Sequence, residues 1–104
     1  MSEIVVIKTI PGEEIIAELV SETNPLHENA ITISRPRVFQ IVGDEQGRPV
    51  PSISPWLATD PDNKKVPMFQ HYIATIIPAP TGIEKAYLQT VSGLDLGSTI
   101  ATAK

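Results

Sequence analysis

The sequence has no cysteine, which excludes disulfide bonds, thiolate metal sites and thiol nucleophiles together. This absence also fits a reducing compartment. The amino terminus carries no basic stretch of the kind that opens a secretory signal, and no apolar run approaches the ~20 residues needed to span a membrane. We therefore expect a soluble, cytoplasmic protein.

Positive charge is also scarce. The chain has 8 lysines and arginines against 12 aspartates and glutamates, so its formal net charge is −4 at pH 7. Nucleic-acid backbones are bound largely through lysine and arginine with release of counterions, so an acidic chain is a poor general nucleic-acid binder. Any basic surface has to be built from few residues.

The remaining composition is that of a globular protein. With 104 residues, 41% hydrophobic and 19% charged, the chain is long enough for one domain with a single core. The 10 prolines and 6 glycines oppose long helices and favour short strands joined by tight turns.

The first apolar run, residues 4–10, is rich in β-branched residues and predicts a strand. Both faces of this strand are apolar, so it either lies centrally in a sheet or meets another subunit with its outer face. Pro11 and Gly12 follow directly and suit a tight turn, because proline fixes φ at one central position and glycine supplies a positive φ at the next.

The next segment, residues 13–20, is ambiguous between helix and strand. Ile15, Ile16, Leu19 and Val20 fall at helical spacing, and glutamate, alanine and leucine are good helix formers. A two-residue link directly after a strong strand instead favours a hairpin partner. We predict a strand.

Three further extended segments follow, separated by polar turns. Pro36 lies inside the first of them and is expected at an edge, a bend or a bulge, because it cannot donate to a sheet. The prediction is therefore five strands that close into a small barrel, since closure removes exposed edges. The three later segments are residues 30–42, 50–58 and 66–77.

One helix is predicted at the carboxyl end, over about residues 82–92. Thr81 and Glu84 have the spacing of a capping box, and Gly93 is a natural terminator. Apolar residues recur every four positions between them. We expect a single domain over residues 1–96 and a flexible tail over 97–104.

Motifs for catalysis or metal binding are absent. The sequence has no Gly-x-Ser-x-Gly pattern, and nothing pairs a nucleophile with a base. Asp60, Asp62 and Asn63 lack the glycine and distant glutamate of a calcium loop and predict a turn. No spacing links His27 with His71, and no third ligand accompanies them. We predict no enzyme activity, no catalytic residues, no metal and no cofactor.

The spacing of four residues on the first hairpin is more specific. Gly12, Ile15, Ala17 and Leu19 match the glycine, aliphatic, small and leucine positions of the first Sm motif. The strings IPGEEIIAELV, ISRPRVFQIV and AYLQTVSGLDL resemble the small Sm-like proteins encoded by cyanophages and related tailed phages, over residues 4–96. The resemblance implies a mostly β fold, a five-stranded antiparallel Sm-like (SH3-like) barrel with one short C-terminal α-helix.

The sequence departs from the Sm pattern in three places. Ile76-Ile77-Pro78 occupies the position of the second motif's Arg-Gly, and the aspartate of the first motif corresponds to Thr23 or Asn24. The usual amino-terminal helix is missing, and the predicted helix lies at the carboxyl end instead.

The resemblance implies a non-catalytic protein that forms a homo-oligomeric ring, between a pentamer and a heptamer, by pairing strand edges of neighbouring subunits. The first strand, apolar on both faces, supports such assembly. The pairing edge should avoid three prolines, which lack an N–H to donate: Pro51, Pro55 and Pro67. For a phage-encoded chain, the compartment would be the host cytoplasm.

Single-stranded RNA is the ligand that the resemblance implies. His27 and Asn29 lie in the loop where Sm proteins stack and hydrogen-bond a base, although an ordinary polar loop would have the same composition. Arg35 and Arg37 would form a phosphate-contacting stripe around a ring; ion pairs with Glu18 or Glu22 are the alternative.

A different class of function remains open, a protein-only ring that serves as scaffold or adaptor in a phage cycle. The aromatic residues fit either class, because they are expected in the core or an interface rather than in a ligand platform: Phe39, Trp56, Phe69 and Tyr72.

Overall fold

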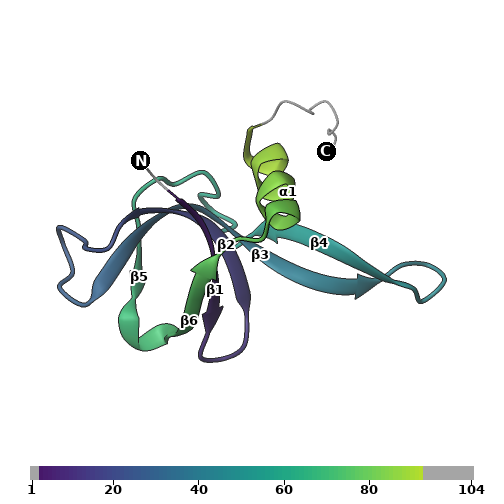
Figure 1. Ribbon diagram of the computed structural model, residues 1–104, viewed down its shortest axis with the longest axis horizontal. Coiled ribbons are helices and arrows are strands. Elements are labelled where there is room, and N and C mark those ends of the chain that lie inside the picture. Colours follow the sequence, from purple (N-terminus) through teal and green to yellow (C-terminus); the bar gives the residue numbers. More distant parts are fainter. Residues whose placement is uncertain (1–2, 93–104) are drawn as a thin grey trace.

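The computed structural model describes residues 3–92, which form one antiparallel sheet of six strands and a short C-terminal helix (Figure 1). The prediction of a mostly β chain with one short helix at the carboxyl end is confirmed. The predicted domain end at residue 96 and the predicted tail, 97–104, lie outside the described residues. The elements are β1 (Glu3–Thr9), β2 (Glu14–Ser21), β3 (Ala30–Gly43), β4 (Pro49–Pro55), β5 (Val66–Phe69), the 3₁₀ turn η1 (Gln70–Tyr72), β6 (Ile73–Pro78) and α1 (Thr81–Ser92).

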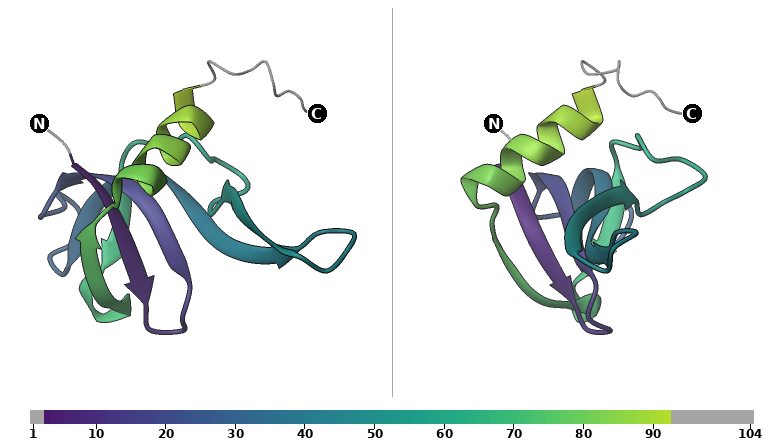
Figure 2. Two further views of the ribbon diagram at one scale, coloured as in Figure 1. Left: turned by 45° about the vertical axis from the view of Figure 1, so that its right-hand side comes forward. Right: turned by 90° about the vertical axis from the view of Figure 1, so that its right-hand side faces the viewer.

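The strands follow the order β4-β3-β2-β1-β6, and β5 pairs with β3 off this path. Figures 1 and 2 show the sheet curled around its own interior. Within residues 3–92, η1 joins β5 to β6 but no strand pairing does, so pairing does not close the sheet. The predicted closed barrel is therefore wrong in this respect: the side between β5 and β6 is open.

The prediction of five strands is also wrong, because the predicted strand 66–77 is two strands. Its first part, β5, pairs with Ala30–Ile33 of β3, whereas its second part, β6, pairs with β1. The chain has to change partners between them, and η1 makes that turn. Two backbone bonds fix η1 in place, from the Gln70 N–H to the Asn29 carbonyl and from the Ile10 N–H to the Tyr72 carbonyl.

A bulge divides the long strand β3. Arg35 has a positive φ of 49°, and the register with β2 shifts so that β3 carries an extra residue there. Pro36 lies in this bulge, which confirms its predicted position. Beyond the bulge, β3 pairs with β4 in a two-stranded arm that projects from the curled part (Figure 1). The arm makes the molecule elongated, 45 × 27 × 27 Å.

The strand prediction for residues 13–20 is confirmed, because this segment forms β2 and pairs with β1. Gly12 has a φ of +113° in the turn between them, as the Pro-Gly pair predicts. Ile15 and Ala17 are completely buried. Burial of this alternating face against the interior outweighs the small helix propensity of the segment.

The core is formed by inward-facing residues of β1, β2, β3 and β5. Trp56 and Tyr72 pack against it, as predicted for these two aromatic residues. None of the helices in residues 3–92 is long and apolar enough to cross a membrane. The core residues are Val5, Ile7, Ile15, Ala17, Ile31, Ile33, Val66 and Met68.

The helix α1 is attached to the sheet at the bulge. Tyr87 is its one buried residue, and the Tyr87 hydroxyl donates to the carbonyls of Ser34 (3.1 Å) and Arg35 (2.9 Å). The predicted capping box between Thr81 and Glu84 is not formed, because the helix begins one residue earlier than predicted. The Glu84 N–H donates to the Pro80 carbonyl (2.8 Å), so Pro80 rather than Thr81 occupies the N-cap position.

A candidate ligand-binding surface around Phe69

The loop between β2 and β3 lies beside the junction of β5 and η1. Ala30 pairs with Phe69 across the sheet, and the Gln70 N–H donates to the Asn29 carbonyl at 2.7 Å. This proximity follows from the topology: since β5 runs antiparallel to the start of β3, the residues before β3 meet the residues after β5.

Two histidine rings flank the Phe69 ring. The His27 and Phe69 centroids are 5.1 Å apart in an edge-on arrangement with an interplanar angle of 66°. The Phe69 and His71 centroids are 5.9 Å apart with an angle of 33°. Phe69 is 38% exposed, and both histidines are exposed. We call these three residues the Phe69 surface; it contains both histidines of the sequence.

Side-chain hydrogen bonds hold the loop in this position. The Asn24 carboxamide accepts from the Leu26 N–H (2.9 Å) and donates to the Thr32 hydroxyl (3.0 Å). The Thr32 hydroxyl in turn donates to the Thr23 carbonyl (2.7 Å), which ties the loop to β3. The loop therefore holds Leu26, which is 83% exposed, and the neighbouring His27 in solvent.

The chemistry available here is stacking and hydrogen bonding. Phenylalanine and imidazole rings offer flat faces to nucleobases, and each stacked base is worth about 1–3 kcal/mol. Imidazole also carries a donor and an acceptor nitrogen. Within residues 3–92, no group of three or more histidine, aspartate or glutamate side chains is arranged to hold a metal ion. The surface therefore suits an aromatic ligand better than a cation.

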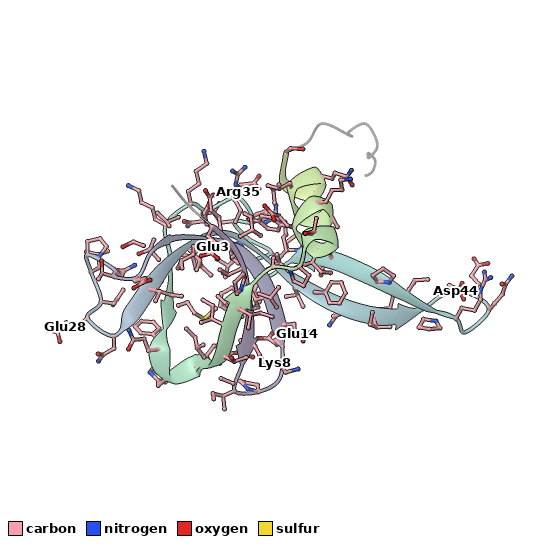
Figure 3. The ribbon with its side chains drawn as sticks, in the orientation of Figure 1. Glu3, Lys8, Glu14, Glu28, Arg35 and Asp44 are labelled. Atoms are coloured by element: carbon pink, nitrogen blue, oxygen red, sulfur yellow. The ribbon has the colours of Figure 1, made fainter. Side chains whose placement is uncertain are left out.

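Of the predicted RNA contacts, His27 and Asn29 lie in this region and the arginines do not. Asn29 is exposed next to η1. Figure 3 shows Arg35 near α1, away from Glu28, which marks the β2–β3 loop. The bulge and the loop are at different places along β3, so the four predicted residues do not form one site.

Arg37 makes contacts within the chain that the sequence did not predict. Its guanidinium pairs with the Asp62 carboxylate (Nη2 to Oδ1, 2.9 Å) and donates to the Pro61 carbonyl. The residue is only 5% exposed. Arg37 thus binds the β4–β5 loop to the bulge, and its ion-pair partner is Asp62 rather than Glu18 or Glu22.

Arg35 belongs to the same structural unit. Its N–H donates to the Asn63 carbonyl at 2.8 Å, and its carbonyl accepts from Tyr87. Its side-chain Nε is buried and has no hydrogen-bond partner in the part of the chain that the structure describes. The backbone of Arg35 therefore joins the bulge to the β4–β5 loop and to α1.

Sequence reasoning missed Phe69 and His71 as site residues. The pairing of β5 with the start of β3 brings them to His27 from about forty positions away in the sequence. To predict this cluster from the sequence, one would have to recognise that the strand predicted over 66–77 breaks at η1. The break places Phe69 and His71 next to the β2–β3 loop. Phe69 was expected in the core or an interface; at 38% exposed it does not lie in the core, and nothing in the structure tests an interface.

The open side of the sheet has an apolar hollow of about 360 Å³. A smaller hollow of about 160 Å³ shares Leu19 and Ile76 with it. Ile76 points inward with Ile7 but is 39% exposed, because no strand covers it. The larger hollow is lined by Leu19, Glu22, Ile31, Gln70, Ile73 and Ile76.

No model of a known protein family matches the sequence, and no curated protein is significantly similar to it.

Proposed function

We propose that this chain is a non-catalytic Sm-like protein that assembles into a homo-oligomeric ring and binds single-stranded RNA at the Phe69 surface. The observation that carries the proposal is the convergence of His27 and His71 on the partly exposed Phe69 ring. A loop residue that resembles the base-contacting position of Sm proteins thereby gains two aromatic neighbours from another part of the chain.

The first hairpin supports the Sm-like assignment. Gly12 lies in its turn with a positive φ, and Ile15 and Ala17 are fully buried next to each other on the inner face. These are the roles that a glycine, an aliphatic and a small residue would have at the corresponding positions of the motif. The resemblance and the packing agree at these positions.

The free edge of β6 supports assembly. The Ala79 N–H donates to the Ile4 carbonyl. Hydrogen-bonded and non-hydrogen-bonded pairs alternate along an antiparallel ladder, so the pair of Ile76 with Ile7 is non-hydrogen-bonded. The N–H and carbonyl of Ile76 therefore point away from β1. This edge avoids Pro51, Pro55 and Pro67, and Pro78 at the end of β6 removes only the last donor from it. A strand of a neighbouring subunit would pair here and cover the hollow, and repetition of such a head-to-tail contact gives a closed ring.

The experiment is a titration of the full chain with short single-stranded RNA at several salt concentrations, read by fluorescence anisotropy. We expect Phe69→Ala to weaken binding about tenfold or more, since a lost stack removes about 1–3 kcal/mol per base. Phe39→Leu is the control: it also removes a phenylalanine ring, but on the part of β3 beyond the bulge, away from the β2–β3 loop, and it should bind RNA like the wild type. The salt dependence should be shallow, because few phosphates are neutralised.

A protein-only scaffold is the second candidate, and the placement of Arg37 favours it. Its guanidinium is occupied by Asp62, and the chain carries a net charge of −4. Absence of any RNA binding at low ionic strength, where electrostatic contacts are strongest, would eliminate the RNA proposal and leave the scaffold.

A further inference from the structure

The face of the sheet that points away from the core carries an apolar residue on every strand of the main path, beside charged residues such as Glu14 and Arg37. Ile77 on β6 is opposite Val6 on β1, which is opposite Ile16 on β2, and Phe39 on β3 is opposite Ile53 on β4. Antiparallel sheets with one solvated face usually place polar residues there. We call these five residues, together with Ile41 two positions beyond Phe39 on the arm, the outer face.

The helix α1 covers the outer face only in part. Two hollows, of about 180 and 640 Å³, share Phe39 and Ile83 and form one groove. The groove runs from β6 across the sheet and continues between α1 and the arm, where it is lined by Ile41, Pro51 and Ile53. Ile41 is 60% exposed. The arm therefore leaves an apolar surface in solvent.

The edge of the arm is closed to another strand. The Asp44 N–H donates to the Arg48 carbonyl, so this pair is hydrogen-bonded. Since hydrogen-bonded and non-hydrogen-bonded pairs alternate along the arm, the backbone groups at Pro49, Pro51 and Pro55 do not bond to β3. Their missing N–H groups therefore fall on the free edge of β4, where a pairing strand would need donors. A partner has to pack on the face of the arm.

We propose that the outer face is a two-fold interface between two copies of this chain, with the two arms packed antiparallel and Ile41 near the axis. Each arm would fill the groove between the α1 and the arm of the other copy. This contact is separate from the proposed ring contact at the open side of the sheet, and it does not depend on RNA binding. A single contact would remove the exposed arm residues of both copies from solvent.

Charge complementarity favours a second copy over another partner. The arm tip carries the Asp44–Arg48 ion pair (3.1 Å), and the groove is lined by Glu14, which pairs with Lys8 (3.9 Å; Figure 3). The two ion pairs lie at similar distances from Ile41 along the arm, on opposite sides of it. Glu14 is opposite Phe39, two positions before Ile41, and Asp44 is three positions after Ile41. Antiparallel arms that cross at Ile41 thus bring the tip of one copy to the ion pair of the other. Each end offers both signs of charge, so opposite charges can meet.

The test is the mass of the full chain in solution, measured by sedimentation equilibrium for the wild type, Ile41→Lys and Val42→Lys. Val42 is the matched control, because it is the next residue, is 40% exposed and points to the other side of the arm. We expect Ile41→Lys to have half the mass of the wild type, whatever the size of the assembly, and Val42→Lys to keep the full mass. Equal masses for the wild type and Ile41→Lys would overturn the proposal.

Cross-linking provides an independent readout, because the chain has no cysteine of its own. A short bismaleimide should link Ile41→Cys into a covalent dimer and leave Val42→Cys uncoupled. Equal coupling of both variants would contradict a contact through this face. If Ile41→Lys instead reduces a larger assembly to monomers, the face belongs to the ring contact and the two-fold arrangement is wrong.

Discussion

At the scale of single residues, Tyr87 has the largest structural role outside the core. It is 1% exposed, and its hydroxyl donates to two carbonyls at the bulge. Burial raises the pKa of Tyr87 to about 12, and the nearby Arg37 and Arg35 charges lower it in part. The neutral hydroxyl is therefore the form that the folded chain favours.

Tyr87→Phe removes the hydroxyl and leaves two carbonyls without this donor. We expect the free energy of unfolding to fall by about 1–3 kcal/mol at neutral pH, measured by urea denaturation. Leu88→Ala, at the neighbouring and 45% exposed position, is the control and should change stability by less than about 0.5 kcal/mol. An equal loss in both variants would show that the hydroxyl contributes nothing specific.

The same tyrosine makes stability depend on alkaline pH. Because its folded pKa lies above the ordinary value of about 10, the folded chain holds the proton more tightly, and stability falls as pH rises from about 10 to about 12. The slope from this group reaches about 1.4 kcal/mol per pH unit. Tyr87→Phe should flatten the fall without abolishing it, since burial and Glu13 also raise the pKa of Tyr72.

Arg37 separates a structural role from RNA contact. Lysine keeps the charge but cannot reach the Asp62 carboxylate and the Pro61 carbonyl with one planar group. We expect Arg37→Lys to lower the free energy of unfolding by about 1–3 kcal/mol in urea denaturation, with RNA affinity unchanged. Unchanged stability with weaker RNA binding would instead support the phosphate contact that the sequence predicted for Arg37.

At the scale of elements, local pattern predicted most strands and the helix. The β-branched run predicted β1, and the Pro11-Gly12 link directly after it predicted β2 as the hairpin partner. The break at η1 was not predicted. It depends on β5 and β6 pairing with different strands, and the residues 70–72 carry no proline or glycine to mark it.

The candidate site was predictable only where it is local. His27 and Asn29 were found from their place in the loop, but Phe69 and His71 reach that loop through pairing with β3. The ion pair of Arg37 was not predicted for the same reason, since Asp62 comes to it from the β4–β5 loop. Contacts between residues far apart in sequence are set by strand pairing, which composition and periodicity do not encode.

The edge of β4 yields a prediction at this scale. Pro49→Thr with Pro55→Thr would restore two N–H donors on the free edge beside that of Ile53. We expect light scattering to rise with time and concentration, because an exposed edge with donors recruits further strands. Pro25→Thr, an exposed change in the β2–β3 loop, should leave scattering at the wild-type level. If the double variant stays as clear as this control, the prolines do not protect the edge.

At the scale of the whole molecule, two apolar surfaces lie on opposite sides of the same sheet. The open side exposes inward-facing residues such as Ile76, whereas the outer face exposes Ile77 and the arm. Because side chains alternate between the two faces of a strand, Ile76 lies on the open side and its neighbour Ile77 lies on the outer face. Substitutions at Ile76 and Ile41 can therefore distinguish the ring contact from the two-fold contact.

Ile76→Asp tests the ring contact. A carboxylate at the mouth of the hollow would have to be buried without a partner when a neighbouring strand covers it, which opposes assembly strongly. In the separate chain the side chain is 39% exposed, so the fold should persist, which circular dichroism would check. We expect sedimentation to show loss of the ring. The melting temperature should rise with protein concentration for the wild type, because assembly stabilises the folded chain, and should do so far less for the variant. Thr75→Asp, on the outer face of β6 opposite Lys8, is the control and should keep the ring even where it weakens the two-fold contact; loss of the ring there too would show that any added charge on β6 disrupts it.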